Sequence, residues 1–344
     1  MGAMRAGMIA IVLLASMVVA SAQAVTLGEV QVLTLGMLPA PLHELLPEAT
    51  RATLLVRRGG SFMTVTPAAM PADFVQARLD AAAALHTMLA FEFKLTPSVP
   101  EHDAWILWGA TVHQRVPVAT AQYLKPSGPA HERTPAAILV PIAACADERA
   151  FLHECTHLAL ARLQPLQQRS LWLEEGLAEL CSDARGTNNR MYLETMPRLP
   201  ARFAAHASAW REPAAPPALT LREMLDAAEP TRDAWLRTDP KRAQMFMAQA
   251  HALVQFLRHV QPDGKIRVVA DNKLLRRVLL LEGRAEGALH GREAFVAALG
   301  SDWNIDAAAE LFRMWLRWCA AQADTGAVHH ERALLRGALS IGAP

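Results

Sequence analysis

The segment His153-Glu154-Cys155-Thr156-His157 constrains this chain more than any other part of its sequence. In a helix, residues four positions apart lie on one face, one turn above the other. Two imidazoles in that arrangement can hold one divalent metal ion from the same side. Glu154 is rotated from His153 by about 100°, so its carboxylate can reach a water molecule beside the ion more easily than the ion itself. The alternative is a surface helix that carries two solvated histidines.

A second segment, Leu171 to Glu179 (LWLEEGLAE), supplies what such a metal site still lacks. A catalytic zinc site has three protein ligands and one open position. Glu175 can provide the third ligand from a neighbouring helix. Glu179 follows four positions later on the same face, where it can accept the spare N–H of one ligand histidine, most simply His153. Gly176 permits a second helix to approach closely. In the alternative interpretation, the acidic residues of this segment form a solvated face.

Together, HECTH and WLEEGLAE resemble the gluzincin branch of the zinc metallopeptidases. The pattern is most similar to a bacterial secreted, peptidase-MA-like family of unknown function that carries W-L-x-E-G-L-A-E. In these families the Glu directly before the Gly is the third zinc ligand, which by motif match is Glu175 and not Glu174. The strong likeness covers residues 151–181, and a weaker likeness extends to about residue 260.

The resemblance implies an exported, zinc-dependent metallopeptidase that acts on a peptide or protein substrate. It implies one catalytic Zn²⁺ bound by His153, His157 and Glu175, with Glu154 as general base and Glu179 as the group that orients a ligand. No segment like the G-A-M-E-N of aminopeptidases precedes the motif, so an endopeptidase is expected. It also implies a zincin-like fold in which an edge strand of the sheet binds extended peptide through its main chain. The strands expected at 137–142 and 112–118 are the candidates.

The group that stabilises the oxyanion of the reaction is harder to identify. The helix at 245–257 resembles a family helix whose Tyr and Trp correspond here to Met247 and His251. The chain has two tyrosines, Tyr123 and Tyr192. His251, Tyr192 and Tyr123 are therefore the candidates, although a lone histidine on a helix is more often structural. Without such a donor the alternative is a catalytically inactive, zinc-stabilised module that binds peptide or envelope components.

Residues 1–24 have the features of a secretory signal peptide, with a cut expected after Ala24. Arg5 precedes an uncharged apolar run of 13 residues, Met8 to Ala20, which is shorter than the roughly 20 residues of a membrane-spanning helix. An uncleaved anchor is the alternative. The rest of the chain has no comparable apolar run, so no membrane span is expected in the mature protein. We expect it to be periplasmic or secreted. The formal net charge of +1 argues against nucleic-acid binding.

The predicted fold class is α+β, with a small mixed β-sheet and the motif helix followed by a mainly helical C-terminal subdomain. The expected division is a β-rich segment at 25–70, a catalytic core at 71–182, a helical subdomain at 183–335 and a tail at 336–344. The patterns predict a hairpin of strands 52–56 and 61–65 around a turn at 57–60, a further strand at 105–108, and helices at 71–90, 148–163, 171–181, 242–260, 272–281 and 305–321. Asp147 is the expected N-cap of the helix at 148–163, and Ser170 is the expected N-cap of the helix at 171–181.

Four cysteines lie in the mature part of the chain, at positions 145, 155, 181 and 319. An oxidising compartment permits disulfides, and four cysteines allow three complete pairings. Three of the four lie close to the HECTH motif in sequence, so one bridge near it and four free buried thiols are both compatible with the sequence. Neither the cleavage specificity nor the oligomeric state follows from these patterns.

Overall fold

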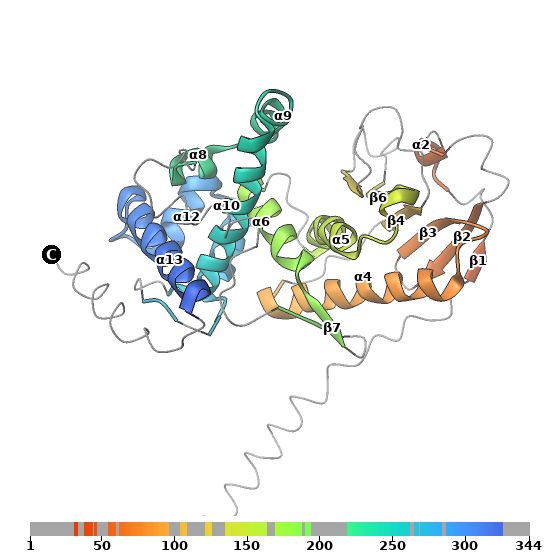
Figure 1. Cartoon of the computed structure of the whole chain (residues 1–344), viewed down its shortest axis with the longest axis horizontal. Coiled ribbons are helices and arrows are strands. Elements are labelled where there is room, and N and C mark those ends of the chain that lie inside the picture. The colour runs from red at the N-terminus through yellow and green to blue at the C-terminus, as the bar shows by residue number, and fades with distance from the viewer. Residues whose placement is uncertain are drawn as a thin grey trace, which may run out of the picture.

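The structure, a computed structural model of the chain, describes residues 31–33, 38–43, 45–46, 54–59, 62–95, 104–108, 121–125, 135–163, 169–187, 190–193, 219–261, 265–267, 269–283 and 287–325. The expected signal segment 1–24, the expected strand 112–118 and the expected tail 336–344 lie outside these residues. The described part is an α+β structure, as expected, in which one sheet and its helices precede a group of C-terminal helices (Figure 1).

Six strands form a single mixed sheet in the order β1-β2-β3-β4-β6-β5. The strands are β1 (Gln31–Leu33), β2 (Leu54–Gly59), β3 (Phe62–Pro67), β4 (Ala104–Trp108), β5 (Gln122–Leu124) and β6 (Ala137–Val140). The three central strands β3, β4 and β6 are parallel, and the outer ones are antiparallel to their neighbours. The central strands are short apolar runs buried along nearly their whole length, as is usual for parallel strands with both faces covered.

The predicted hairpin is confirmed as β2 and β3, but the connection between the strands is shorter than the predicted turn at 57–60. Arg57 belongs to β2 and pairs with Thr64, and Gly59 pairs with Phe62. Only two residues remain for the connection, which is the commonest length in a β-hairpin. The two arginines of the predicted turn therefore lie within the strand.

Of the two candidates for the edge strand, the one at 137–142 does not lie at the edge of the sheet. β6 lies between β4 and β5, and Tyr123 in β5 pairs with Ile138 in β6. The outermost described strand on this side is β5. Its three residues are only partly buried and form no apolar run, so the local pattern does not predict a strand there.

Both faces of the sheet are covered. Alternate residues of the strands pack against the long helix α4 (Ala72–Phe93) and against α5 (Glu148–Leu163) on one face. The intervening residues form a second cluster with leucines at positions 38, 42 and 46, around the short helix α2 (Ala40–His43). In β4, for example, Ile106 faces α4 and α5 whereas Leu107 faces the other way, as the two-residue period of a strand requires.

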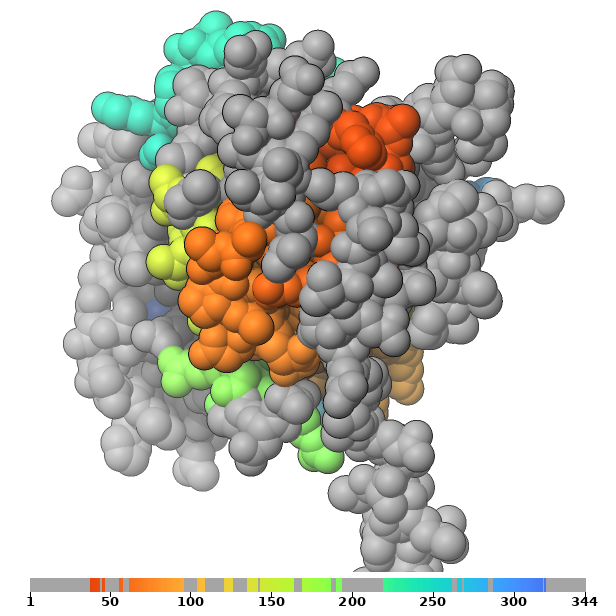
Figure 2. All heavy atoms as spheres, turned by 90° about the vertical axis from the view of Figure 1, so that its right-hand side faces the viewer, coloured from red at the N-terminus to blue at the C-terminus, as the bar shows by residue number. Residues whose placement is uncertain are grey.

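Seen from the sheet end (Figure 2), the orange surface of residues 62–95 lies between the teal surface around residue 230 and the green surface of residues 169–193.

The helix α6 (Leu171–Ser182) follows α5 and lies in the middle of the molecule, between α5 and α10 (Figure 1). All of its residues are buried, including three glutamates. The remaining elements are the hairpin β7 (Arg185–Thr187) and β8 (Arg190–Tyr192) and the helices α8 (Leu221–Asp226), α9 (Glu229–Thr238), α10 (Pro240–His259), α11 (Lys273–Glu282), α12 (Gly291–Leu299) and α13 (Ile305–Thr325). Since α6 is covered on every side, its polar residues must find partners within the protein.

The helix limits that the sequence predicts agree closely with the structure, but one of the two predicted caps differs. Asp147 caps α5, because its Oδ1 accepts from the N–H of Ala150 at 2.9 Å. Ser170 precedes α6, yet its hydroxyl does not cap that helix. Instead, Glu282 accepts the N–H of Ser170 at 3.1 Å and also contacts the Ser170 hydroxyl. The Ser170 hydroxyl is thus engaged by a carboxylate of α11 and not by the first turn of α6.

All four cysteines are free thiols, and three of them are buried. Among the described residues, no helix is both long enough and apolar enough to cross a membrane.

Candidate metal centre

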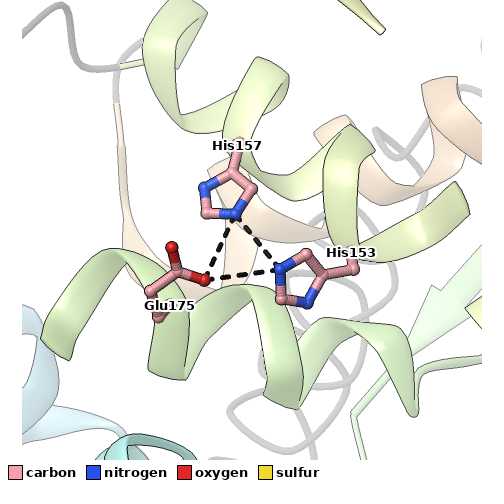
Figure 3. Close-up of side chains that lie close together, drawn as sticks. All are labelled: His153, His157 and Glu175. Atoms are coloured by element: carbon pink, nitrogen blue, oxygen red, sulfur yellow. Dashed lines mark hydrogen bonds and ion pairs between the residues drawn. The ribbon is translucent and has the colours of Figure 1, made fainter. Parts of the chain in front are cut away.

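Three side chains from two neighbouring helices point at a common spot (Figure 3). His153 and His157 project from one face of α5, and Glu175 projects towards them from α6. The two Nε2 atoms are 3.2 Å apart. Glu175 Oε2 lies 3.4 Å from Nε2 of His153 and 3.6 Å from Nε2 of His157. The three ligands expected from the sequence are therefore brought together.

The spacing of these three atoms fits a metal ion. Zinc binds histidine nitrogen and carboxylate oxygen at about 2.0–2.2 Å, and a tetrahedron of that size has edges of about 3.4 Å. The observed sides of 3.2, 3.4 and 3.6 Å are close to that length. Three ligands on one side leave a fourth position open. The group formed by His153, His157 and Glu175 can thus hold a metal ion.

Each histidine also faces a second carboxylate on its other ring nitrogen. Nδ1 of His153 lies 3.6 Å from Oε1 of Glu179, which agrees with the arrangement expected from the sequence. Nδ1 of His157 lies 3.3 Å from Oε1 of Glu174, a partner that the sequence analysis did not assign. The sequence does contain a hint of this second partner. Glu174 is adjacent to the expected ligand Glu175, and the two histidines of the facing helix lie one turn apart. At these distances the two carboxylates are ion-pair partners of the rings and not hydrogen-bond acceptors. A carboxylate that does hydrogen-bond to the second nitrogen of a ligand histidine fixes the ring and raises its basicity.

The two outer carboxylates are in turn paired with cations. Arg149 Nη2 lies 3.1 Å from Oε2 of Glu179. Lys125 Nζ lies 3.3 Å from Oε2 of Glu174, and it also contacts Glu229 on α9. Lys125 follows β5, so this contact connects the sheet edge with α6 and α9. The buried negative charges therefore have compensating positive charges nearby.

The third ligand has a cationic partner as well. Arg232 on α9 donates from Nη1 to Oε1 of Glu175, the oxygen that faces away from the two imidazoles. The side chain of Arg232 is 26% exposed, and that of Glu175 is buried. Arg232 is 57 positions from Glu175 along the chain, and no motif marks it, so the sequence analysis missed it.

Glu154 is held beside the ligands by the main chain of β5. Its Oε2 accepts from the N–H of Tyr123 at 2.7 Å. Burial raises the pKa of Glu154, although the nearby His157 and His153 act in the opposite direction. The ring of Tyr123 stacks on that of His157, with centroids 5.8 Å apart and planes inclined by 13°. A carboxylate with a raised pKa is better suited to exchange protons near neutral pH.

The charges of the centre perturb its own titration. Burial alone would lower the pKa of His157, but Glu175 and Glu174 outweigh that effect and raise it to about 10. Burial alone would raise the pKa of Glu174, but His157 and Lys125 lower it to about 2. The pKa of Glu175 is likewise held well below its usual range, because His157 and His153 outweigh the effect of burial. A metal ion that binds His157 must displace the proton that this raised pKa favours, so protons and metal compete for this imidazole.

The three candidate oxyanion donors lie in different surroundings. His251 is on α10 and only 1% exposed. Tyr192 ends β8 and is 45% exposed. Tyr123 alone is shown in contact with a proposed ligand, His157.

Gly176 has the role that the sequence suggested. A Cβ at this position would lie 2.5 Å from the carbonyl oxygen of Ala250 and 2.6 Å from Cγ2 of Val254, both on α10. Real side chains essentially never approach so closely. The absence of a side chain therefore lets α10 pack directly against the helix that carries Glu175.

No protein-family model matches this chain, and no curated protein matches it significantly.

Proposed function

We propose that this protein is an exported zinc metallopeptidase of the gluzincin type with a zincin-like fold. The observation that carries the proposal is the convergence of His153, His157 and Glu175 at a spacing suited to zinc, with Glu154 beside them. Two histidines and a carboxylate are an established ligand set for catalytic zinc, and they leave room for substrate. The residues 1–24 supply the export signal in this proposal.

A zinc ion bound by these residues supplies a Lewis acid, which acidifies water and polarises the carbonyl of a peptide bond. Glu154 takes the proton from the attacking water and passes it to the departing amine. Its raised pKa and its fixed position against the Tyr123 amide support this role. Glu179 and Glu174 orient the two ligand imidazoles.

The edge of β5 supports a peptide as the substrate. β5 is antiparallel to β6 and outermost among the described strands on the side of the centre. The Tyr123 N–H points to Glu154, so main-chain groups of this edge face the catalytic carboxylate. Among the described residues no strand pairs with the outer edge of β5, although its Tyr123 N–H is already donated to Glu154. An exposed strand edge can bind an extended peptide by main-chain pairing without reading its side chains. We propose that the substrate lies along this edge, as in the gluzincins.

Tyr123 is the first of the three candidate oxyanion donors to test, because its ring touches His157. His251 and Tyr192 stay in the proposal as alternatives. The burial of His251 means that it could contact a substrate only after a rearrangement of α10.

The decisive experiment replaces Glu154 by Gln in the purified mature protein. The variant is expected to bind one zinc ion as tightly as wild type, because Glu154 is not a ligand. Its rate of peptide cleavage should fall by about 10²- to 10⁴-fold, the usual contribution of a general base. Zinc content is measured by metal analysis, and cleavage is measured with a library of quenched fluorescent peptides.

Glu148→Gln is the matched control, since Glu148 lies on the same helix with an exposed side chain that pairs with Arg78. This control should retain both zinc and activity. A wild-type protein that binds one zinc ion but cleaves no peptide in a broad library contradicts the peptidase proposal. It would leave a zinc-stabilised module that binds peptide or envelope components.

A further inference from the structure

The helix α9 lies against the metal centre mainly through polar contacts. None of its residues is buried. Glu229, near its start, contacts Lys125 beside β5, and Arg232, one turn later, contacts Glu175 on α6. On the side of the C-terminal helices, Trp235 packs against Phe246 of α10, with ring centroids 5.8 Å apart. A helix without a buried residue of its own therefore places one guanidinium group against a buried carboxylate of the proposed metal site.

The guanidinium of Arg232 is held on two sides. Nη1 donates to Oε1 of Glu175. Nη2 and Nε lie 3.3 and 3.4 Å from Oδ1 of the neighbouring Asp233. The planar group is thus oriented by one carboxylate and directed at the other. This is an arrangement for which the rigid fork of arginine is better suited than the flexible ammonium of lysine.

The two oxygens of Glu175 consequently have different partners. Oε2 faces His153 and His157 at 3.4 and 3.6 Å, whereas Oε1 is taken by Arg232. A carboxylate without an outer partner can rotate and bind a metal through either oxygen or through both. With Oε1 occupied, only Oε2 is free to bind an ion, and less side-chain freedom is lost when it does so.

We propose that Arg232 is a positioning residue for the metal ligand Glu175, and that it restricts this carboxylate to coordination through one oxygen. The inference rests on the proposed zinc site, but it does not depend on peptide hydrolysis. Arg232 completes a set in which every ligand has an oriented partner outside the triad, since Glu179 and Glu174 face the two histidines. It also makes the placement of α9 a condition for tight metal binding.

The test compares Arg232→Ala, Arg232→Lys and Arg237→Ala with wild type. Arg237 is the matched control because it lies on the same helix, is exposed, and carries the same charge. Zinc affinity is measured by competition with a chromophoric chelator, and the visible spectrum is recorded after substitution with Co²⁺. Circular dichroism and thermal unfolding of the metal-free proteins show whether each variant folds.

Arg232→Ala is expected to bind zinc about 10- to 100-fold more weakly, the usual effect of removing an outer partner of a ligand. Its Co²⁺ spectrum should become weaker, as is typical when a released carboxylate raises the coordination number. Arg232→Lys should recover part of the affinity, and Arg237→Ala should stay within about twofold of wild type.

The proposal is overturned if folded Arg232→Ala keeps wild-type affinity and spectrum, or if Arg237→Ala loses as much affinity. The second result would mean that only the overall charge of α9 matters. If Arg232→Ala does not fold, the Arg232→Lys variant decides. Lysine has no planar guanidinium group, so wild-type zinc affinity and a wild-type Co²⁺ spectrum in this variant would contradict the positioning role. A wild-type protein that binds zinc without cleaving peptides contradicts the proposed function alone, whereas a wild-type protein that binds no zinc contradicts both.

Discussion

Each residue of the triad depends on one side chain outside it. His153 faces Glu179, His157 faces Glu174, and Glu175 accepts from Arg232. An imidazole can bind a metal only through a nitrogen that carries no proton, so the partner on the opposite nitrogen decides which tautomer is available. The motif indicates the candidate ligands, and we propose that the affinity of the centre for a metal ion depends on these outer partners.

Glu174→Ala is expected to weaken zinc binding by about 10- to 100-fold while leaving the fold intact. The change removes the carboxylate 3.3 Å from Nδ1 of His157, and Lys125 keeps its contact with Glu229. Chelator competition measures the affinity. The control is Glu310→Ala. The side chain of Glu310 is exposed on α13 and pairs with Arg313 at 2.9 Å. An unchanged affinity in folded Glu174→Ala would show that this carboxylate does not orient His157.

At the scale of elements, the centre depends on how closely three helices pack. α6 lies between α5, which carries the histidines, and α10, which supports it from behind. The contact with α10 is possible because position 176 has no side chain. A displacement of α6 would move Glu174, Glu175 and Glu179 together, since all three project from this one helix.

Gly176→Ala is expected to lower the free energy of unfolding by about 1–3 kcal/mol, the usual cost of overpacking a core. The added Cβ would meet the Ala250 carbonyl oxygen at 2.5 Å, and a backbone atom cannot move aside alone. Urea denaturation of the metal-free protein measures the change. Gly186→Ala is the control, because its nearest neighbour, the Arg190 carbonyl oxygen, would be 3.7 Å from the new Cβ. Equal stability of the two variants would rule out the close packing inferred here.

At the scale of the whole molecule, a buried carboxylate connects the centre with the C-terminal helices. Glu282, at the end of α11, accepts the N–H of Ser170 at 3.1 Å and that of Gly291 at 3.3 Å. It also contacts the Ser170 hydroxyl. Ser170 starts the helix that carries Glu175, and Gly291 starts α12. The Gly291 N–H also donates to the Ser170 hydroxyl, so the starts of α6 and α12 are joined through Ser170 and Glu282 together.

Glu282→Ala is expected to destabilise the protein by about 2–4 kcal/mol, because it leaves the buried N–H and hydroxyl of Ser170 without their carboxylate acceptor. Thermal and urea unfolding measure the loss. The exposed Glu293 on α12 provides the control, since its replacement by Ala should change the stability by less than about 0.5 kcal/mol. A Glu282→Ala protein as stable as this control would mean that water or other groups satisfy the N–H and hydroxyl of Ser170.

The sequence by itself determined the local features of the centre. The spacing of His153 and His157 and the limits of α5 and α6 follow from helix geometry, which acts over a few residues. The motif match also indicated Glu175 as the third member of the group that the structure brings together.

Only the tertiary structure decided which distant groups complete the centre. The Tyr123 amide against Glu154, the guanidinium of Arg232 on Glu175, and β5 as the edge strand join residues that lie tens of positions apart. Helical periodicity does not specify these contacts, because an arginine on an exposed helix or a three-residue strand has the same local pattern wherever it packs. Their partners are fixed only when burial of the whole core brings the sheet edge, α6 and α9 to one place.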